Sequence, residues 1–131
     1  MRHLKRAIGL AAIVVGGLAY AAPLGFIHSE LPVVLGAINE DLVSHVIYTH
    51  HKELRTCYEA GLESDEKMVG KVSVKFIIGS DGMVVNSEIK HSTLGDEEVE
   101  GCIVDEFYNM DFPAPERGKA IVTAPFTFQP L

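Results

Sequence analysis

Residues Gly70–Leu94 read GKVSVKFIIGSDGMVVNSEIKHSTL, and this stretch decides the fold. Its first half alternates: apolar side chains at every second position from Val72 to Ile78 fall on one face, and Ser73 and Lys75 fall on the other. A period of two is typical of a strand with one buried face. Ser80-Asp81-Gly82 then predicts a turn, because glycine adopts positive φ at little cost. The stretch therefore predicts a β-hairpin.

The second strand of this hairpin runs from Met83 to Lys90 and is less regular than the first. Val84 and Ile89 have opposite parity, so strict alternation cannot bury both side chains. One extra residue in the strand would restore a common face. We therefore expect a β-bulge, whose position the sequence does not give.

A helix is expected before the hairpin. Asn39 is a plausible N-cap, and Glu40 and Asp41 follow in the first turn, where acids suit the helix dipole. Gly61 is a natural C′ residue, which predicts the end of the helix. Apolar positions recur at spacings near 3.6 residues, which is typical of a helix with one buried face. They are Leu42, Val46, Leu54 and Cys57.

A second helix and a last strand are expected after the hairpin. Asp96 can cap that helix, and its apolar face consists of Val99, Cys102, Ile103 and Phe107. The last strand is Ala120–Gln129, in which Pro125 predicts an edge strand or a bulge. The predicted fold class is α+β, in the order α-β-β-α-β, with a three-stranded antiparallel sheet packed by two helices.

Length and charge narrow the classes of function. The 131 residues allow one domain, and their formal net charge is −7. Loss of the first 21 residues would remove three basic side chains and leave a net charge of about −10. An acidic domain without a basic stripe argues against nucleic acid and against anionic lipid head groups as partners.

The N-terminus indicates export. Three basic residues precede an uncharged run from Ala7 to Ile27, and Ala19-Tyr20-Ala21 has the form of a signal-peptidase site. Residues 1–21 are therefore a candidate signal peptide. The run of about 21 residues is also long enough, at about 31 Å, for an uncleaved membrane anchor that extends to about residue 27. In either case residues 22–38 are expected to be a short linker, residues 39–131 the domain, and the location outside the cytoplasm.

Cys57 and Cys102 are the two cysteines of the chain. In an exported protein such a pair is most simply a disulfide, and two buried free thiols are the alternative. Their spacing excludes CxxC redox chemistry. A zinc site would need two further ligands at suitable spacing, which the sequence around the cysteines does not provide.

No motif indicates catalysis. His50 and His51 are adjacent and point about 100° apart on a helix, while His45 and His50 are five residues apart, so neither pair has helical metal-site spacing. The acids from Asp96 to Glu100 are typical of a solvated helix start. No nucleophile elbow or phosphate loop is present in the sequence. We expect no enzyme activity, no metal and no cofactor.

Taken in order, these features resemble the TonB C-terminal domain, and within that group the AgmX/PglI-type C-terminal domain. The resemblance spans roughly Leu42 to Gln129. The segments that carry it are Cys57-Tyr58, Gly70-Lys71-Val72, Asp81-Gly82, Ser92-Thr93-Leu94, Cys102-Ile103, Phe112-Pro113 and Pro125-Phe126.

The resemblance implies a non-catalytic periplasmic interaction domain, in a group linked with gliding motility and envelope machinery. TonB captures an extended segment of its partner at a sheet edge. The corresponding edge here is the last strand, and the expected partner-binding residues are Ile121, Val122, Thr123, Ala124, Phe126, Thr127 and Phe128. Pro125 would partly blunt that edge. The alternative is a small structural subunit of an envelope or motility complex, which docks through the first helix or an apolar patch.

This sequence differs from TonB in the length of the spacer between the N-terminal segment and the domain. TonB has a long proline-rich spacer, whereas about 15 residues separate Ala22 from Gly36 here and span at most about 55 Å. Even if it is anchored, the domain would therefore stay near the inner membrane, which argues against energy transduction of the TonB type.

Overall fold

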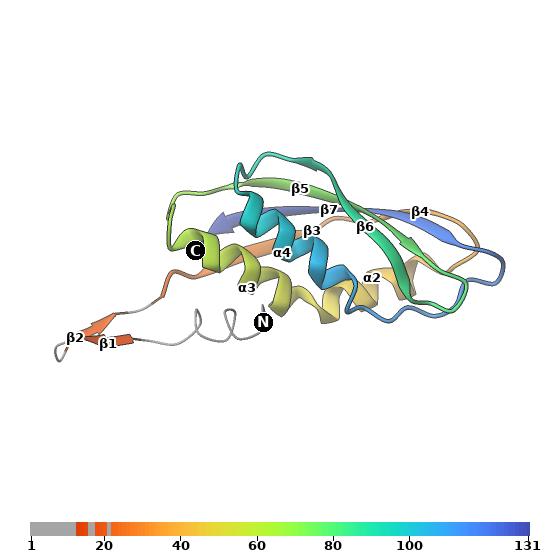
Figure 1. Ribbon diagram of the computed structural model, residues 1–131, viewed down its shortest axis with the longest axis horizontal. Coiled ribbons are helices and arrows are strands. Elements are labelled where there is room, and N and C mark those ends of the chain that lie inside the picture. The colour runs from red at the N-terminus through yellow and green to blue at the C-terminus, as the bar shows by residue number, and fades with distance from the viewer. Residues whose placement is uncertain (1–12, 16–17, 21) are drawn as a thin grey trace.

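The computed structural model describes residues 13–15, 18–20 and 22–131. Its elements are β1 (Ile13–Val15), β2 (Leu18–Tyr20), β3 (Gly25–Ser29), β4 (Val33–Leu35), α2 (Glu40–Thr49), α3 (His51–Leu62), β5 (Gly70–Ile78), β6 (Val84–Ser92), α4 (Glu97–Phe107) and β7 (Ala120–Pro130). The fold is α+β with an antiparallel sheet, as expected. Figure 1 shows a two-layer arrangement in which α2, α3 and α4 lie on one side of the sheet.

The main sheet has five strands rather than three. Strands β3, β7, β5 and β6 follow one another in that order, and β4 pairs with β7 beside β3. Both additional strands lie in residues 22–38, the segment expected to be a linker. The folded unit therefore begins at β3, ahead of the expected boundary at residue 39.

Most of the expected signal peptide or anchor falls on residues 1–12, 16–17 and 21, which lie outside the described residues. Its described part forms β1 and β2, which pair with each other in a separate two-stranded sheet. An anchor helix that continues to about residue 27 is incompatible with β3, which pairs with β7 from Gly25 onward. Among the described residues, none of the helices has the length and apolar character required to span a bilayer.

The hairpin is confirmed. Along β5 the side chains of Val72, Val74, Phe76 and Ile78 are all fully buried, as the alternation predicts. At the turn, Gly82 has φ +90°, and a Cβ there would lie 2.1 Å from the carbonyl oxygen of Phe112. Glycine is therefore required for two reasons, the backbone conformation and the close approach of a neighbouring chain segment.

The bulge is confirmed as well. The register of β6 against β5 shifts twice, between the partners of Ile77 and Ile78 and between the partners of Ser73 and Val74. The first shift passes over Val85, so that Val84 and Ser87 are both buried although Ser87 is an odd number of positions, three, after Val84. Ile89 then follows on the same face and packs against the core.

The helix expected from Asn39 to Gly61 is two helices. Asn39 caps α2 as predicted, since its side chain accepts hydrogen bonds from the amides of Asp41 and Leu42. The chain then breaks at His50, where φ is −103° and ψ is 7°. Gly61 is not a C′ residue but lies inside α3. A Cβ there would meet Val99 of α4 at 2.4 Å, so this glycine allows the two helices to approach closely.

The second expected helix is α4, and Asp96 caps it by accepting hydrogen bonds from the amides of Glu98 and Val99. Its apolar face packs on the sheet around Phe76. The ring of Phe76 lies 4.8 Å from that of Phe107 and 5.4 Å from that of Phe112, measured between centroids. These aromatic contacts form the centre of the core between the helices and the sheet.

Candidate functional site

The strand expected to capture a partner is the centre of the sheet, so the expectation of a free edge at β7 is wrong. Residues 120–128 of β7 pair with β5 on one side, while residues 121–123 and 126–130 pair with β4 and β3 on the other. All the expected partner-binding residues therefore pair with β5, and all except Ala124 also pair with β4 or β3 on the other side. They are Ile121, Val122, Thr123, Ala124, Phe126, Thr127 and Phe128.

Pro125 has a different role from the one expected. It lies in β7 opposite Ser73 of β5, at the point where β3 has ended and β4 has not yet begun. Its carbonyl oxygen accepts a hydrogen bond from the amide of Glu30, 3.0 Å away, on the β3 side. Proline has no N–H group to donate. Pro125 lies between the stretches of β7 that pair with β3 and with β4, so neither strand loses a ladder hydrogen bond.

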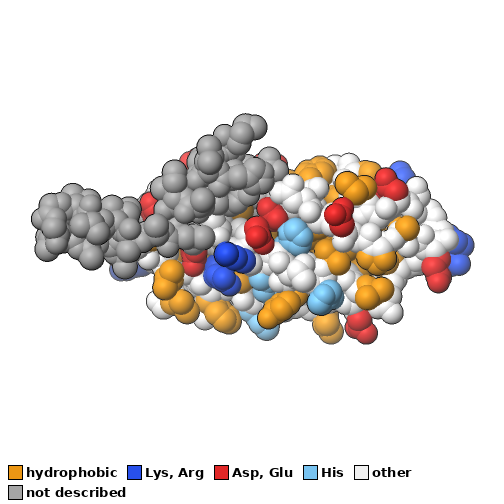
Figure 2. Space-filling view, turned by 90° about the horizontal axis from the view of Figure 1, so that it is seen from below, with side chains coloured by type: hydrophobic (Ala, Val, Ile, Leu, Met, Phe, Trp, Pro, Cys, Tyr) orange, Lys and Arg blue, Asp and Glu red, His pale blue; other side chains and the backbone are white. Residues whose placement is uncertain are grey.

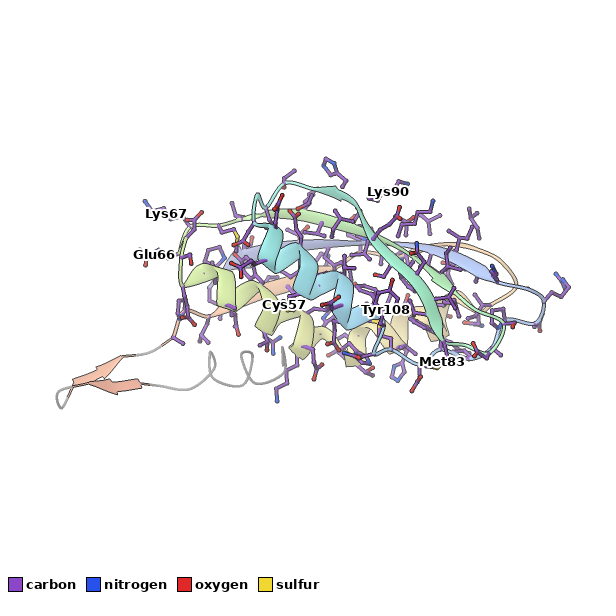
Figure 3. The ribbon with its side chains drawn as sticks, in the orientation of Figure 1. Cys57, Glu66, Lys67, Met83, Lys90 and Tyr108 are labelled. Carbon is purple, nitrogen blue, oxygen red and sulfur yellow. A yellow bond between two sulfur atoms is a disulfide. The ribbon has the colours of Figure 1, made fainter. Side chains whose placement is uncertain are left out.

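The true edges of the sheet are β6 and the β3–β4 side, and both are partly covered. On β6, Met83 forms a bridge with Asp111, and the amide of Ser87 donates to the hydroxyl of Tyr108 at 3.0 Å. Figure 3 shows Tyr108 beside β6 and Met83 at the end of the hairpin. On β3, the amide of Gly25 donates to the carboxylate of Glu59 at 2.8 Å. These contacts cover part of each edge and shorten the run of backbone groups that could pair with an added strand.

The face of the sheet away from the helices carries an apolar row. Because Val122 and Phe76 point into the core, their neighbours Ile121 and Ile77 point to the opposite face. Ile121 pairs with both Leu35 and Ile77, which places apolar side chains of β4, β7 and β5 side by side. We call Val33, Leu35, Ile77 and Ile121 the open-face patch.

Three of the four residues of the open-face patch are exposed, and the fourth, Ile77, is half-buried. The exposed fractions are 64% for Leu35, 60% for Val33 and 38% for Ile121. The next positions across the same face are polar, since Lys75 pairs with Thr123 on one side and with Glu88 on the other. An exposed apolar cluster with a polar surround is typical of a surface that binds another protein.

The helix side of the molecule has a different character. Figure 2 shows acidic, basic, histidine and scattered hydrophobic side chains intermixed over its visible part. A cavity of about 360 Å³ lies between α3 and α4 beside the cysteines, and its wall includes Asp96, Glu97, Glu98 and Asp105. One of these acids, Asp96, is the N-cap of α4, so its carboxylate is already hydrogen-bonded to backbone amides of that helix.

The expected disulfide is present. Cys57 of α3 and Cys102 of α4 are bonded, with 5.6 Å between their Cα atoms, and Cys57 is buried. The bond joins α3 to α4, two of the three helices that lie on the sheet. It is compatible with an oxidising, exported compartment, where such bonds persist.

A polar cluster lies between the same two helices, at the helix break. Nδ1 of His50 lies 2.8 Å from Oε2 of Glu106, a carboxylate that is only 3% exposed, and Glu53 lies beside them. The spacing of histidines in the sequence does not reveal this cluster, because Glu106 is 56 residues further along the chain than His50. The spacing of His50 and Glu53, three residues apart at the start of a helix, is the sequence feature that could have indicated this cluster.

His51 takes no part in that cluster. Its ring packs near Tyr48 and Phe126, and its buried Nε2 atom has no hydrogen-bond partner among the described residues. Burial lowers the pKa of His51, and the positive charges of Arg55 and His28 lower it further. Burial of the ring therefore disfavours its protonated form. His45, the third histidine considered from the sequence, is exposed on α2.

Comparison of the chain with protein-family models, with curated proteins and with solved structures gave no match. The features of the molecule that bear on its function are the open-face patch, the covered edges, the disulfide and the His50 cluster.

Proposed function

We propose that this chain is a non-catalytic protein-interaction module of the periplasm, which docks an envelope protein on the open-face patch. The observation that carries the proposal is the row of apolar side chains that crosses β4, β7 and β5 on the face away from the described helices; it is exposed on β4 and β7 and half-buried at Ile77 of β5. A lone exposed leucine would mean little, but adjacent apolar side chains on three paired strands, exposed on two of them, form one surface.

The proposal includes the TonB-like, AgmX/PglI-type membership that the sequence motifs suggest. The disulfide between Cys57 and Cys102 supports an exported location, and the acidic charge supports a protein partner rather than nucleic acid or anionic lipid. Binding by strand addition at β7 is not part of the proposal, because β7 is paired on both sides. The partner instead covers side chains of the sheet face.

The binding experiment compares two exposed leucines. A photo-cross-linking residue is placed at Val33 in the chain expressed in its own cells, and adducts are compared for wild type, Leu35→Glu and Leu42→Glu. Leu42 lies on α2 and is 50% exposed, so it is a matched control on the opposite side of the molecule. We expect Leu35→Glu to remove the adduct and Leu42→Glu to retain it.

Two results would reject the open-face patch as the docking surface. One is an adduct that persists at wild-type level in Leu35→Glu, and the other is equal loss in both variants. Because both leucines are exposed, neither substitution removes core packing, and matching urea midpoints would verify that both variants fold.

The location is tested separately by the intact mass of the mature protein under non-reducing conditions. A mass that corresponds to cleavage after Ala21 and retention of the disulfide supports a released periplasmic protein. An uncleaved mass would instead favour the membrane-attached subunit that the sequence left open, since the first residues would remain on the chain.

A further inference from the structure

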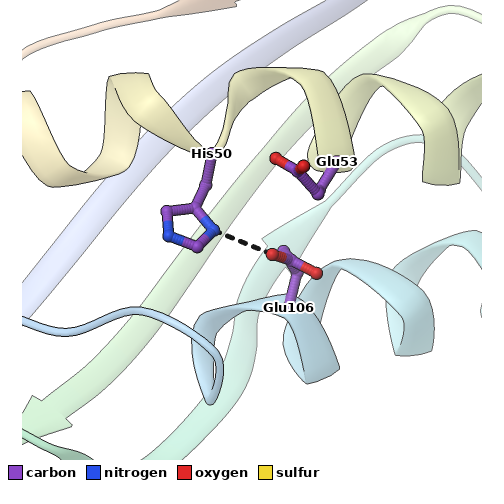
Figure 4. A group of neighbouring side chains, drawn as sticks. All are labelled: His50, Glu53 and Glu106. Carbon is purple, nitrogen blue, oxygen red and sulfur yellow. Dashed lines mark hydrogen bonds and ion pairs between the residues drawn. The ribbon is translucent and has the colours of Figure 1, made fainter. Parts of the chain in front are cut away.

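Three potential ligand atoms converge where α2 meets α3. They belong to His50 at the helix break, Glu53 in the first turn of α3 and Glu106 near the end of α4, and all lie within 4.8 Å of one another. Figure 4 shows the three side chains directed toward one another across the gap between the helices. His50 and Glu106 are already in contact, at 2.8 Å between Nδ1 and Oε2.

The fold holds these side chains in place. The break at His50 puts its ring at the start of α3, and Glu53 follows one turn later on the same side of the helix. Glu106 lies one turn after Cys102, and the disulfide fixes α4 against α3 through Cys57. A covalent bond therefore fixes the helices that carry the donors, which reduces the entropy lost when a ligand binds.

The charge of the cluster favours a cation. Glu106 is 3% exposed, and burial of a carboxylate is costly unless positive charge and hydrogen bonds compensate it. His50 can supply one positive charge when protonated, whereas the cluster contains two carboxylates. The side-chain amide of Asn109 donates to Oε1 of Glu106 at 3.2 Å, which orients the carboxylate as outer-shell groups do around metal ligands.

We propose that His50, Glu53 and Glu106 form a binding site for a first-row divalent transition-metal ion such as Zn²⁺. One imidazole nitrogen and two carboxylate oxygens suit Zn²⁺, and water can complete a tetrahedral shell. Ca²⁺ and Mg²⁺ prefer shells made of oxygen alone, so the imidazole discriminates against them. The ion takes the place of the proton between His50 and Glu106 and links α3 to α4 a second time, beside the disulfide.

The test is calorimetric titration of the full chain, free of metal and of any histidine tag, with zinc chloride. We expect one Zn²⁺ per chain, with binding that weakens as pH falls because protons compete for His50. His50→Gln and Glu53→Gln should each lower the affinity for Zn²⁺ by about tenfold or more. The matched control is His45→Gln, which removes an exposed histidine of α2 and should leave affinity unchanged.

Substituting Co²⁺ for Zn²⁺ gives a second readout, because visible absorption bands of bound Co²⁺ report its ligands. These bands should change in His50→Gln and stay the same in His45→Gln. Absence of Zn²⁺ binding would overturn the proposal, as would equal affinity in wild type, His50→Gln and Glu53→Gln. Glu53 is only half-buried, so Glu53→Gln keeps the test decisive if His50→Gln does not fold. The site is distinct from the open-face patch, and failure of either proposal leaves the other standing.

Discussion

The carboxylate of Glu59 accepts a hydrogen bond from the backbone amide of Gly25, with 2.8 Å between Oε2 and the amide nitrogen. This contact joins α3 to β3, the strand that closes one side of β7. Gly25 also lies against Tyr58, because a Cβ at this position would approach the Tyr58 ring to 2.5 Å. The first strand of the main sheet is therefore fixed by two consecutive residues of one helix.

Glu59→Ala is expected to destabilise the fold and to loosen β3 in particular. Glu59 is only 4% exposed, and its removal leaves the amide of Gly25 without its partner, which costs about 1–3 kcal/mol. The measurements are urea unfolding and hydrogen exchange of the β3 amides. Glu59→Gln, which keeps an oxygen acceptor, should lose less stability than Glu59→Ala. Equal losses would show that the hydrogen bond to Gly25 does not matter.

Loss of the disulfide is expected to destabilise the chain without changing its fold. Cys57 and Cys102 are 45 residues apart, and closure of a loop of this length contributes about 4 kcal/mol in the chain-entropy model. The double variant Cys57→Ser with Cys102→Ser should show this loss in urea unfolding. A reductant should destabilise wild type and leave the double variant unchanged. An unchanged wild type under full reduction would contradict the prediction.

Stability is expected to fall at high pH because of Tyr58. Burial raises the pKa of Tyr58 to about 12, and the negative charge of Asp65 contributes. Its hydroxyl donates to the carbonyl oxygen of Met68. Because the folded state holds the phenol proton more tightly than the unfolded state, the stabilisation is complete below pH 10 and is lost as pH rises to about 12.

The size of this loss is on the order of 3 kcal/mol, from the two-unit difference between folded and unfolded pKa values. The measurement is the free energy of unfolding across that pH range for wild type and Tyr58→Phe. Lysines and other tyrosines titrate in both proteins, so the difference between the two curves isolates Tyr58. Parallel curves would show that Tyr58 does not carry the pH dependence.

Sequence patterns predicted those elements of the fold that depend on residues close together in the chain. The alternation in β5, the turn at Gly82, and the caps Asn39 and Asp96 each arise from interactions within a few residues. The parity conflict between Val84 and Ile89 predicted a bulge because one face had to be buried. The disulfide followed from cysteine number and an expected export signal.

The parts that failed depend on distant pairing. β3 and β4 have five and three residues and follow an uncharged run, so periodicity could not separate them from a linker. If β3 and β4 are not recognised, β7 is predicted to be an edge strand, and Pro125 is then interpreted as a residue that prevents unwanted pairing at that edge. The His50 cluster was missed for the same reason, since Glu106 reaches His50 only when α4 packs on α3.

Two glycines of the paired helices should respond in opposite ways to alanine. At Gly61 of α3 a new methyl group would lie 2.4 Å from Val99 and 2.6 Å from Met68, so Gly61→Ala should destabilise the fold by about 1–3 kcal/mol. Gly101 lies within α4, and a Cβ added there would meet no described atom within 4 Å, so Gly101→Ala should stabilise the fold by up to about 1 kcal/mol, as alanine is the better helix former. Urea unfolding of both variants measures the two effects. Stabilisation by both substitutions would mean that helix propensity, and not the close approach of α3 to α4, determines the response at Gly61.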